Sequence, residues 1–246
     1  MKTLTDRPIT RVSLLLVLLL CAYGMVYFAA MKAYPHDRPH LLGLMGIGVV
    51  CILLGSYLTS HIWLRFIARK LDESQFENYE ASNAILQELA DRAGFDIELR
   101  VLPAERIFIY SAGLTNRLVL ISSGTLKKLS TEAMRGVLAH EVAHMVLNHA
   151  AKNGSALAAF FGLRIAFQFP KGVGLAMVFW LLLYLRHREY EADKVAALMV
   201  GRAPIIEALN EVKELTKTRE FGKLMEFLIS THPSYERRIL ALKDMH

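Results

Sequence analysis

The sequence has little cysteine, no internal repeat and no low-complexity segment. Its two cysteines, Cys21 and Cys51, both lie within apolar stretches. They lack the spacing of metal-binding cysteines, and nothing in the sequence indicates a disulfide between them. We therefore interpret both as small apolar side chains, and they give no evidence for an oxidising compartment.

Acidic residues are fewer than basic ones, 23 against 29, so the net charge is +6. A basic balance can indicate nucleic-acid binding. Here, however, the basic residues gather beside apolar runs, an arrangement that is typical of membrane spans. They are Lys2, Arg7 and Arg11 near the N-terminus and Arg65, Arg69 and Lys70 further along. We therefore expect a lipid bilayer as a partner and no nucleic acid.

Charge is absent from two runs of 20 residues, 12–31 and 41–60. At about 1.5 Å of rise per residue, each forms a helix of roughly 30 Å, enough to cross the hydrocarbon core. We predict a transmembrane hairpin in residues 1–70, with both ends in the cytoplasm because the basic residues lie there. A cleaved signal peptide is the alternative for the first run, but no small-residue cleavage site follows it.

Residues 71–246 are expected to form one further domain, mostly α-helical with a small β-sheet. An amphipathic helix is predicted at 72–93, where Gly94 ends it. Runs of branched and aromatic residues predict strands at 97–102, 106–110 and 117–122. Another helix is predicted from its cap at Ser130 to about residue 153.

A third apolar stretch, 156–185, differs from the first two because Arg164, Pro170 and Lys171 interrupt it. Each half has only 14 residues, which is short for a span and suits a re-entrant hairpin or a buried helix pair. We interpret it as an apolar helical insertion in the domain. Charged helices follow, with predicted boundaries at Arg186, Gly201, Pro204 and Pro233.

The chemistry of the chain is indicated by His140-Glu141-Val142-Ala143-His144, an H-E-x-x-H motif. Helical positions four apart differ by about 40° around the axis, so both imidazoles can hold one metal ion. Zinc at such a site lowers the pKa of a bound water towards ~7, and Glu141 is placed to remove its proton. The alternative is a pair of structural histidines on a buried helix.

A catalytic zinc ion needs a third protein ligand. His149 lies about 180° around a continuous helix from His140, so we expect it not to bind the same ion. A later charged helix offers Glu189 and Asp193 on one face, where one can bind the metal while the other orients a ligand histidine. Glu191 points about 200° away from Glu189. Without the histidine motif, this segment would be interpreted as a solvated charged helix.

The candidate ligands flank the apolar stretch 156–185. If this stretch crossed the membrane once, the histidines and the carboxylates would lie on opposite sides, and no site would form. We therefore expect it to return to the side on which it starts, with a turn near Pro170.

The sequence resembles the HtpX-type membrane metalloproteases, which are related to the CAAX prenyl proteases. The resemblance rests on the two N-terminal apolar runs and on the segments ISSGTLKKLSTEAMRGVLAHEVAH, REYEAD and THPSYERR. It implies a zincin-like (gluzincin) catalytic domain with one Zn²⁺ per chain, bound by His140, His144 and Glu189. It also implies that His232 and Arg238 lie near the active site, where they would stabilise the oxyanion formed on attack. By themselves, these two would be interpreted as a helix start and a surface residue.

The resemblance further implies an endopeptidase of the bacterial inner membrane, with its catalytic domain facing the cytoplasm. Its substrates would be unfolded or membrane proteins in quality control. Independently of the resemblance, we expect an extended substrate to add to an edge strand at 106–110. The segment RIFIYSAG stands where the family often has Asn-Ala-Phe-Ala, so substrate preference stays open, as does the oligomeric state. A prenyl-protein protease and a non-enzymatic membrane adaptor with a retained zinc site are the alternatives.

Overall fold

The computed structural model describes residues 73–112, 117–150, 152–153, 171–216 and 232–245, together with the single residues 32 and 156. The hairpin predicted at 12–31 and 41–60 and the first half of the stretch 156–185 lie outside these residues, apart from 156 itself. Within the described ranges, no helix combines the length and apolarity that crossing a membrane requires. Two compact units are present, and one of them combines Leu71–Gly154 with Val178–His246.

The first long helix, α3, spans Tyr79–Ala93 and follows a short 3-10 turn, η2, at Glu73–Gln75. It begins later than predicted because Asn78, just before it, has the left-handed conformation (φ 63°) that a helix cannot contain. Its predicted end is confirmed: Gly94 has a φ of 76°, and its backbone N–H donates to the carbonyls of Ala90 and Asp91. Glycine is the usual residue at such a left-handed cap.

The sheet has three strands in the order β1-β3-β2. Strands β1 (Ile97–Leu102) and β3 (Arg117–Ser122) have the predicted bounds and pair in parallel. Strand β2 (Ile109–Ala112) pairs antiparallel with β3, begins three residues later than the predicted 106 and ends two residues after the predicted 110. The reason lies at Phe108, whose N–H donates to the Thr125 hydroxyl at 3.0 Å instead of to a strand.

The H-E-x-x-H motif lies on α5, Thr131–Val146, which follows the short helix α4, Ser123–Lys128. Ser130 caps α5 as predicted, since its hydroxyl accepts the N–H of Ala133 at 3.1 Å. The expectation that this helix continues to residue 153 is wrong. It ends at Val146, because Asn148 adopts a left-handed conformation with a φ of 55° before helical residues resume at 149.

Three further helices complete the described part: α7 (Lys171–Val200), α8 (Arg202–Thr216) and α10 (Tyr235–Lys243). Helix α7 is continuous, so the second apolar half and the charged segment after it form one helix instead of two. Gly201, with a φ of 86°, separates α7 from α8. Ser234 caps α10 by accepting the Arg237 N–H, so this helix begins at Tyr235, two residues after the boundary predicted at Pro233.

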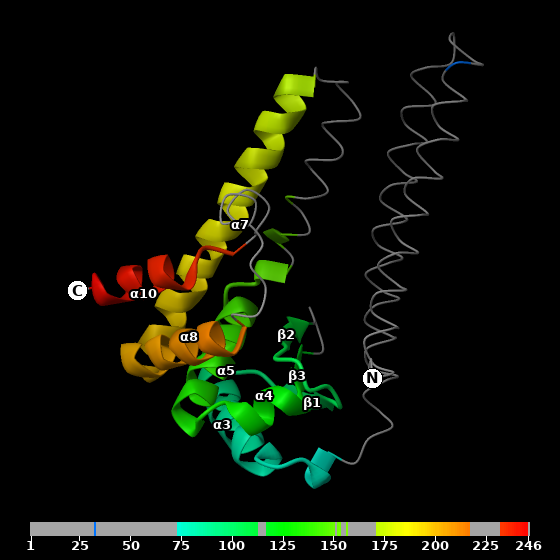
Figure 1. Cartoon of the computed structure of the whole chain (residues 1–246), viewed down its shortest axis with the longest axis vertical. Helices are drawn as coiled ribbons and strands as arrows, with labels where there is room; N and C mark the ends of the chain where they lie inside the picture. The colour runs from blue at the N-terminus through cyan, green and yellow to red at the C-terminus, as the bar shows by residue number, and fades with distance from the viewer. Residues whose placement is uncertain are drawn as a thin grey trace. The chain divides into compact units, whose positions relative to one another are not determined.

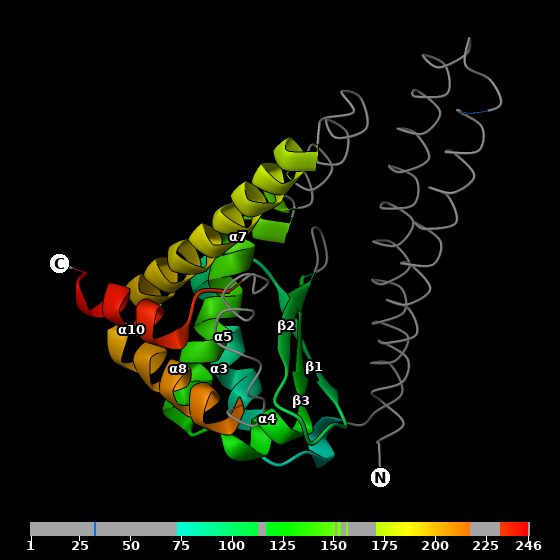
Figure 2. The same cartoon turned by 45° about the horizontal axis from the view of Figure 1, so that its top comes forward.

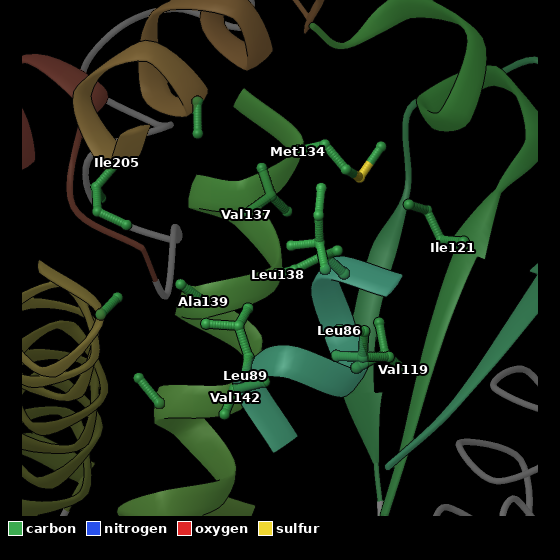
Figure 3. Close-up of a cluster of buried hydrophobic side chains, with 14 of the residues drawn as sticks. Leu86, Leu89, Val119, Ile121, Met134, Val137, Leu138, Ala139, Val142 and Ile205 are labelled. Carbon is green, nitrogen blue, oxygen red and sulfur yellow. The ribbon is translucent and has the colours of Figure 1, made fainter. Parts of the chain in front are cut away.

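The core is built around α5. Figures 1 and 2 both show α5 between the sheet and α8. On its sheet side, Leu138 packs with Leu86 of α3 and with Val119 of β3, and all three are fully buried (Figure 3). On its other side, α5 approaches α8 so closely that a Cβ on Gly136 would lie 2.1 Å from the Pro204 carbonyl oxygen. The mostly helical fold with a small sheet is thus confirmed, and α5 is fixed from both sides.

Candidate metal centre

Two histidines of α5 face each other one turn apart. His140 Nε2 and His144 Nε2 lie 3.0 Å from each other, and the rings meet edge to face. Both side chains are largely buried, with 13% and 17% of their surface exposed. The helical spacing therefore brings two imidazole nitrogens to one point, as predicted.

Glu189 of α7 completes a cluster with these two nitrogens. Its Oε1 lies 3.5 Å from His144 Nε2, and its Oε2 lies 3.6 Å from His140 Nε2. One ligand atom from each of the three residues lies within 4.8 Å of the others, which suits a shared metal ion. The sequence left open whether Glu189 or Asp193 would bind the metal. In the structure, Glu189 is the carboxylate that joins the cluster.

The cluster fits a metal ion by its donor types as well as by its geometry. Two imidazoles and one carboxylate are the ligand set of a catalytic zinc site that keeps one position open. Glu189 Oε2 is buried, and nitrogens of His232, Arg238 and His140 lie 2.9, 3.4 and 3.6 Å from it. Buried carboxylates are stabilised by paired charges or by a coordinated metal, and this carboxylate also lies beside the Nε2 atoms of both histidines.

Asp193 lies behind His140. Its Oδ1 is 2.9 Å from His140 Nδ1, the ring nitrogen that points away from the cluster. Arg238 of α10 holds this carboxylate from the other side with two hydrogen bonds, Nε to Oδ2 at 2.7 Å and Nη2 to Oδ1 at 2.6 Å. Arg238 is only 7% exposed, so its interpretation as a surface residue is wrong. It also reaches Glu189, with Nη1 3.4 Å from Oε2.

These contacts shift the pKa values of the cluster strongly. Burial and the Arg238 charge lower the pKa of His140, but the carboxylates Asp193 and Glu189 outweigh them and raise it to about 9. Burial and the neighbouring His140 charge lower the pKa of His144 to about 3. Burial raises the pKa of Glu189, yet hydrogen bonds from His140 and His232 bring it well below its usual range. Without metal, the carboxylates therefore favour the charged form of His140, whereas burial favours the neutral form of His144.

Glu141 and His232 are the two remaining predicted residues of the site. Glu141 is 9% exposed and forms no hydrogen bond or ion pair with any residue that the structure describes. His232, which precedes α10, is 64% exposed, and its Nδ1 lies 2.9 Å from Glu189 Oε2. Glu191 points elsewhere, as expected, because its Oε2 pairs with Arg188 Nη1 at 2.6 Å.

His149 is a part of the site that sequence reasoning placed wrongly. Its ring was expected to point away from the motif, but its Nδ1 lies 2.8 Å from His144 Nδ1, and the residue is 1% exposed. The expectation assumed a continuous helix, whereas the left-handed Asn148 redirects the chain just before His149. Asparagine tolerates this conformation better than most residues, so Asn148 was the signal in the sequence that the helix could end before His149. His149 does not belong to the three-residue cluster, and burial together with the Arg188 charge lowers its pKa.

Comparisons with known proteins agree with this site. Residues 80–246 match peptidase family M48. Over 58% of its length, the chain is 28% identical to "Protease HtpX" of Vibrio cholerae serotype O1 (strain M66-2) and covers 63% of that protein. It is 25% identical to "Protease HtpX" of Acinetobacter baylyi over 83% of this chain and 88% of that one.

The fold resembles that in the crystal structure of S. mikatae Ste24p, with a TM-score of 0.60 and 21% sequence identity. The similarity covers 95% of this chain and 64% of that one. The chain thus spans about two thirds of the length of this neighbour and of the Vibrio relative.

Proposed function

Because this chain belongs to peptidase family M48, we propose that it is a zinc-dependent endopeptidase. The observation that carries the proposal is the convergence of His140, His144 and Glu189, whose ligand atoms lie within 4.8 Å of one another. When bound there, zinc would supply a Lewis acid that polarises a peptide carbonyl and acidifies water. The two histidines come from one helix and the carboxylate from another, so the packing of α5 against α7 sets the site.

In this proposal, Glu141 is the general base. It stands next to the ligand His140 on α5, and no residue of the described part engages its carboxylate. A carboxylate without a fixed partner can accept a proton from water and return it to the leaving amine. Glu141 follows the ligand His140 directly, so its side chain points about 100° around the helix from that of His140 and need not bind the metal.

His232 and Arg238 support the reaction in different ways. His232 is exposed and lies at the rim of the cluster, 2.9 Å from Glu189. An imidazole there can donate a hydrogen bond to the oxygen that becomes negative when the carbonyl is attacked. Arg238 is buried, and Asp193 already engages its Nε and Nη2. We therefore assign Arg238 and Asp193 to orienting His140, a role that is typical of carboxylates behind metal-binding histidines.

The substrate would be an extended segment of an unfolded protein. Strand β2 is an edge of the sheet, so one side of its backbone has no strand partner among the described residues. Its Tyr110 is 51% exposed. A substrate that adds to such an edge is recognised mainly through its backbone. This matches a broad preference for unfolded or misassembled proteins over a fixed sequence.

We further propose that the enzyme is anchored in the inner membrane through a hairpin in residues 1–70, with spans at 12–31 and 41–60. Each run has 20 uncharged residues, and basic residues at their outer ends favour a cytoplasmic catalytic domain. The beginning of α7 adds exposed apolar side chains, which suit contact with lipid: Val173, Leu175, Val178, Phe179, Trp180 and Leu183. Membrane proteins that have lost their partners are therefore the substrates that we expect.

The test is Glu141→Gln in the full chain. We expect one zinc ion per chain to remain, while cleavage of an unfolded substrate falls by about 10²–10⁴-fold, the usual contribution of a general base. Glu132→Gln is the matched control, because Glu132 lies on the same helix but is exposed in its first turn. Unchanged cleavage by Glu141→Gln would refute the assignment of the base, and a wild-type chain without zinc would refute the proposed function.

A further inference from the structure

The ring of His144 has two nitrogens, and both have a neighbour. Its Nε2 faces Glu189 Oε1 at 3.5 Å, on the side of the metal cluster. Its Nδ1 faces His149 Nδ1 at 2.8 Å, on the opposite side. We infer that His149 and Glu191 hold the ring of His144 in its metal-binding orientation and tautomer, as positioning residues; this inference rests on the zinc site proposed above.

The count of hydrogen atoms supports the inference. A 2.8 Å contact between two imidazole nitrogens requires a single hydrogen between them. If His144 binds metal through Nε2, its ring is neutral and carries its hydrogen on Nδ1, which then donates to His149. The ring of His149 accepts at Nδ1, so its own hydrogen lies on Nε2. The contact therefore sets the tautomers of both rings once a metal is bound.

The hydrogen on His149 Nε2 needs an acceptor. This atom is buried and forms no hydrogen bond of good geometry within the described ranges. Glu191 Oε2 lies 3.4 Å from it and is the acceptor that the structure places beside this N–H. A buried N–H without an acceptor is costly, and a carboxylate is a strong acceptor. The contacts that lead from His144 through His149 to Glu191 thus end on a negatively charged carboxylate.

The local backbone and the neighbouring charges fix this arrangement. Asn148 has a φ of 55°, and the left-handed turn that it forms comes immediately before His149. On α7, Arg188 donates from Nη1 to Glu191 at 2.6 Å and from Nη2 to the Tyr184 hydroxyl at 2.7 Å. Glu191 is therefore held by its own helix, the same helix that carries the candidate ligand Glu189.

The two metal-binding histidines are then supported in parallel ways. His140 contacts the carboxylate of Asp193 directly, with 2.9 Å between Nδ1 and Oδ1. His144 reaches the carboxylate of Glu191 through one intervening imidazole. Partners of this kind fix the ring of a ligand histidine, and their loss typically weakens metal binding about 10–100-fold. If His149 only filled space, a ring of similar size without nitrogen would serve equally well.

The experiment compares zinc affinity, measured by competition with a chelator, among full-length variants. His149→Phe keeps a ring but cannot accept a hydrogen bond, so we expect zinc binding to weaken by about 10–100-fold. His149→Asn places an amide oxygen where Nδ1 stands and should recover most of this loss. Glu191→Gln should weaken binding only a few-fold. The control is Lys194→Gln on α7, an exposed position on the same helix, and it should leave the affinity unchanged.

The thermal midpoint of the metal-free protein separates positioning from packing. We expect it to differ little between His149→Phe and His149→Asn, although their zinc affinities differ. Equal zinc affinities for wild type, His149→Phe and Glu191→Gln would overturn the inference, and so would an Asn variant as weak as the Phe variant. If His149→Phe does not fold, Glu191→Gln still decides, since its side chain is partly exposed. A wild-type protein that binds no zinc would instead refute the proposed function.

Discussion

The contact between α5 and α8 offers a severe test of how the site is held. A Cβ added to Gly136 would lie 2.1 Å from the Pro204 carbonyl oxygen, 2.6 Å from its carbon and 3.0 Å from Ala208 Cβ. Two of these atoms belong to the backbone, so relief requires the helices to move apart. Overpacking of this kind costs up to about 3 kcal/mol, whereas replacing a helical glycine by alanine gains about 1 kcal/mol. The expected net loss for Gly136→Ala is about 2 kcal/mol.

In a domain of this size, that loss lowers the thermal midpoint by roughly 4–8 °C, measured by circular dichroism on the full chain in detergent. Gly136 lies one turn before His140, so we also expect weaker zinc binding. The matched control is Gly172→Ala on α7, where an added Cβ meets no atom within 4 Å; this variant should be neutral or slightly more stable. A Gly136→Ala protein as stable as wild type would show that the two helices do not pack as described.

Two other predictions concern the ligands. Glu189→Ala should remove nearly all bound zinc in metal analysis, whereas Glu191→Ala should weaken binding without emptying the site; the reverse pattern would contradict the ligand assignment. In chelator-treated protein, the free energy of unfolding should fall as the pH rises from 6.5 to 9. Folding raises the pKa of His140 from 6.5 to about 9. Over this window, the folded chain therefore keeps a proton that the unfolded chain has released. Denaturant unfolding at pH 6.5 and at pH 9 measures this change. Asp193→Asn should make the decrease in unfolding free energy smaller. An unfolding free energy that rises over this window would refute the assigned charge of His140.

Local signals in the sequence were sufficient for several boundaries. Gly94 ends α3 and Ser130 begins α5 because caps act within one turn of the chain. The bounds of β1 and β3 follow from runs rich in branched residues, and the core buries four of the six residues in β1 and five of the six in β3. The start of β2 was missed because the hydroxyl of Thr125, remote in sequence, binds the backbone at Phe108. A tertiary contact of this kind leaves no periodic pattern.

The candidate site was predictable in its chemistry more than in its geometry. The spacing of His140 and His144 on one helix fixed their common direction, and the resemblance to a known family selected Glu189. The position of His149 was not accessible in this way, because one left-handed residue, Asn148, changes the direction of everything after it. Helical geometry predicts directions only while the helix lasts. The place of a side chain beyond such a break depends on the fold.

Arg238 is buried because the carboxylate of Asp193, which lies behind His140, needs a positively charged partner. A lone carboxylate behind His140 would fix that ring, but burying its charge without a partner costs several kcal/mol. Arg238 removes most of this cost, because it engages both oxygens of Asp193 in a two-point contact that suits the guanidinium. Its third nitrogen faces Glu189 at 3.4 Å. Helix α10, the last of the described helices, therefore supplies the charge that lets both carboxylates of α7 stay ionised beside the motif on α5.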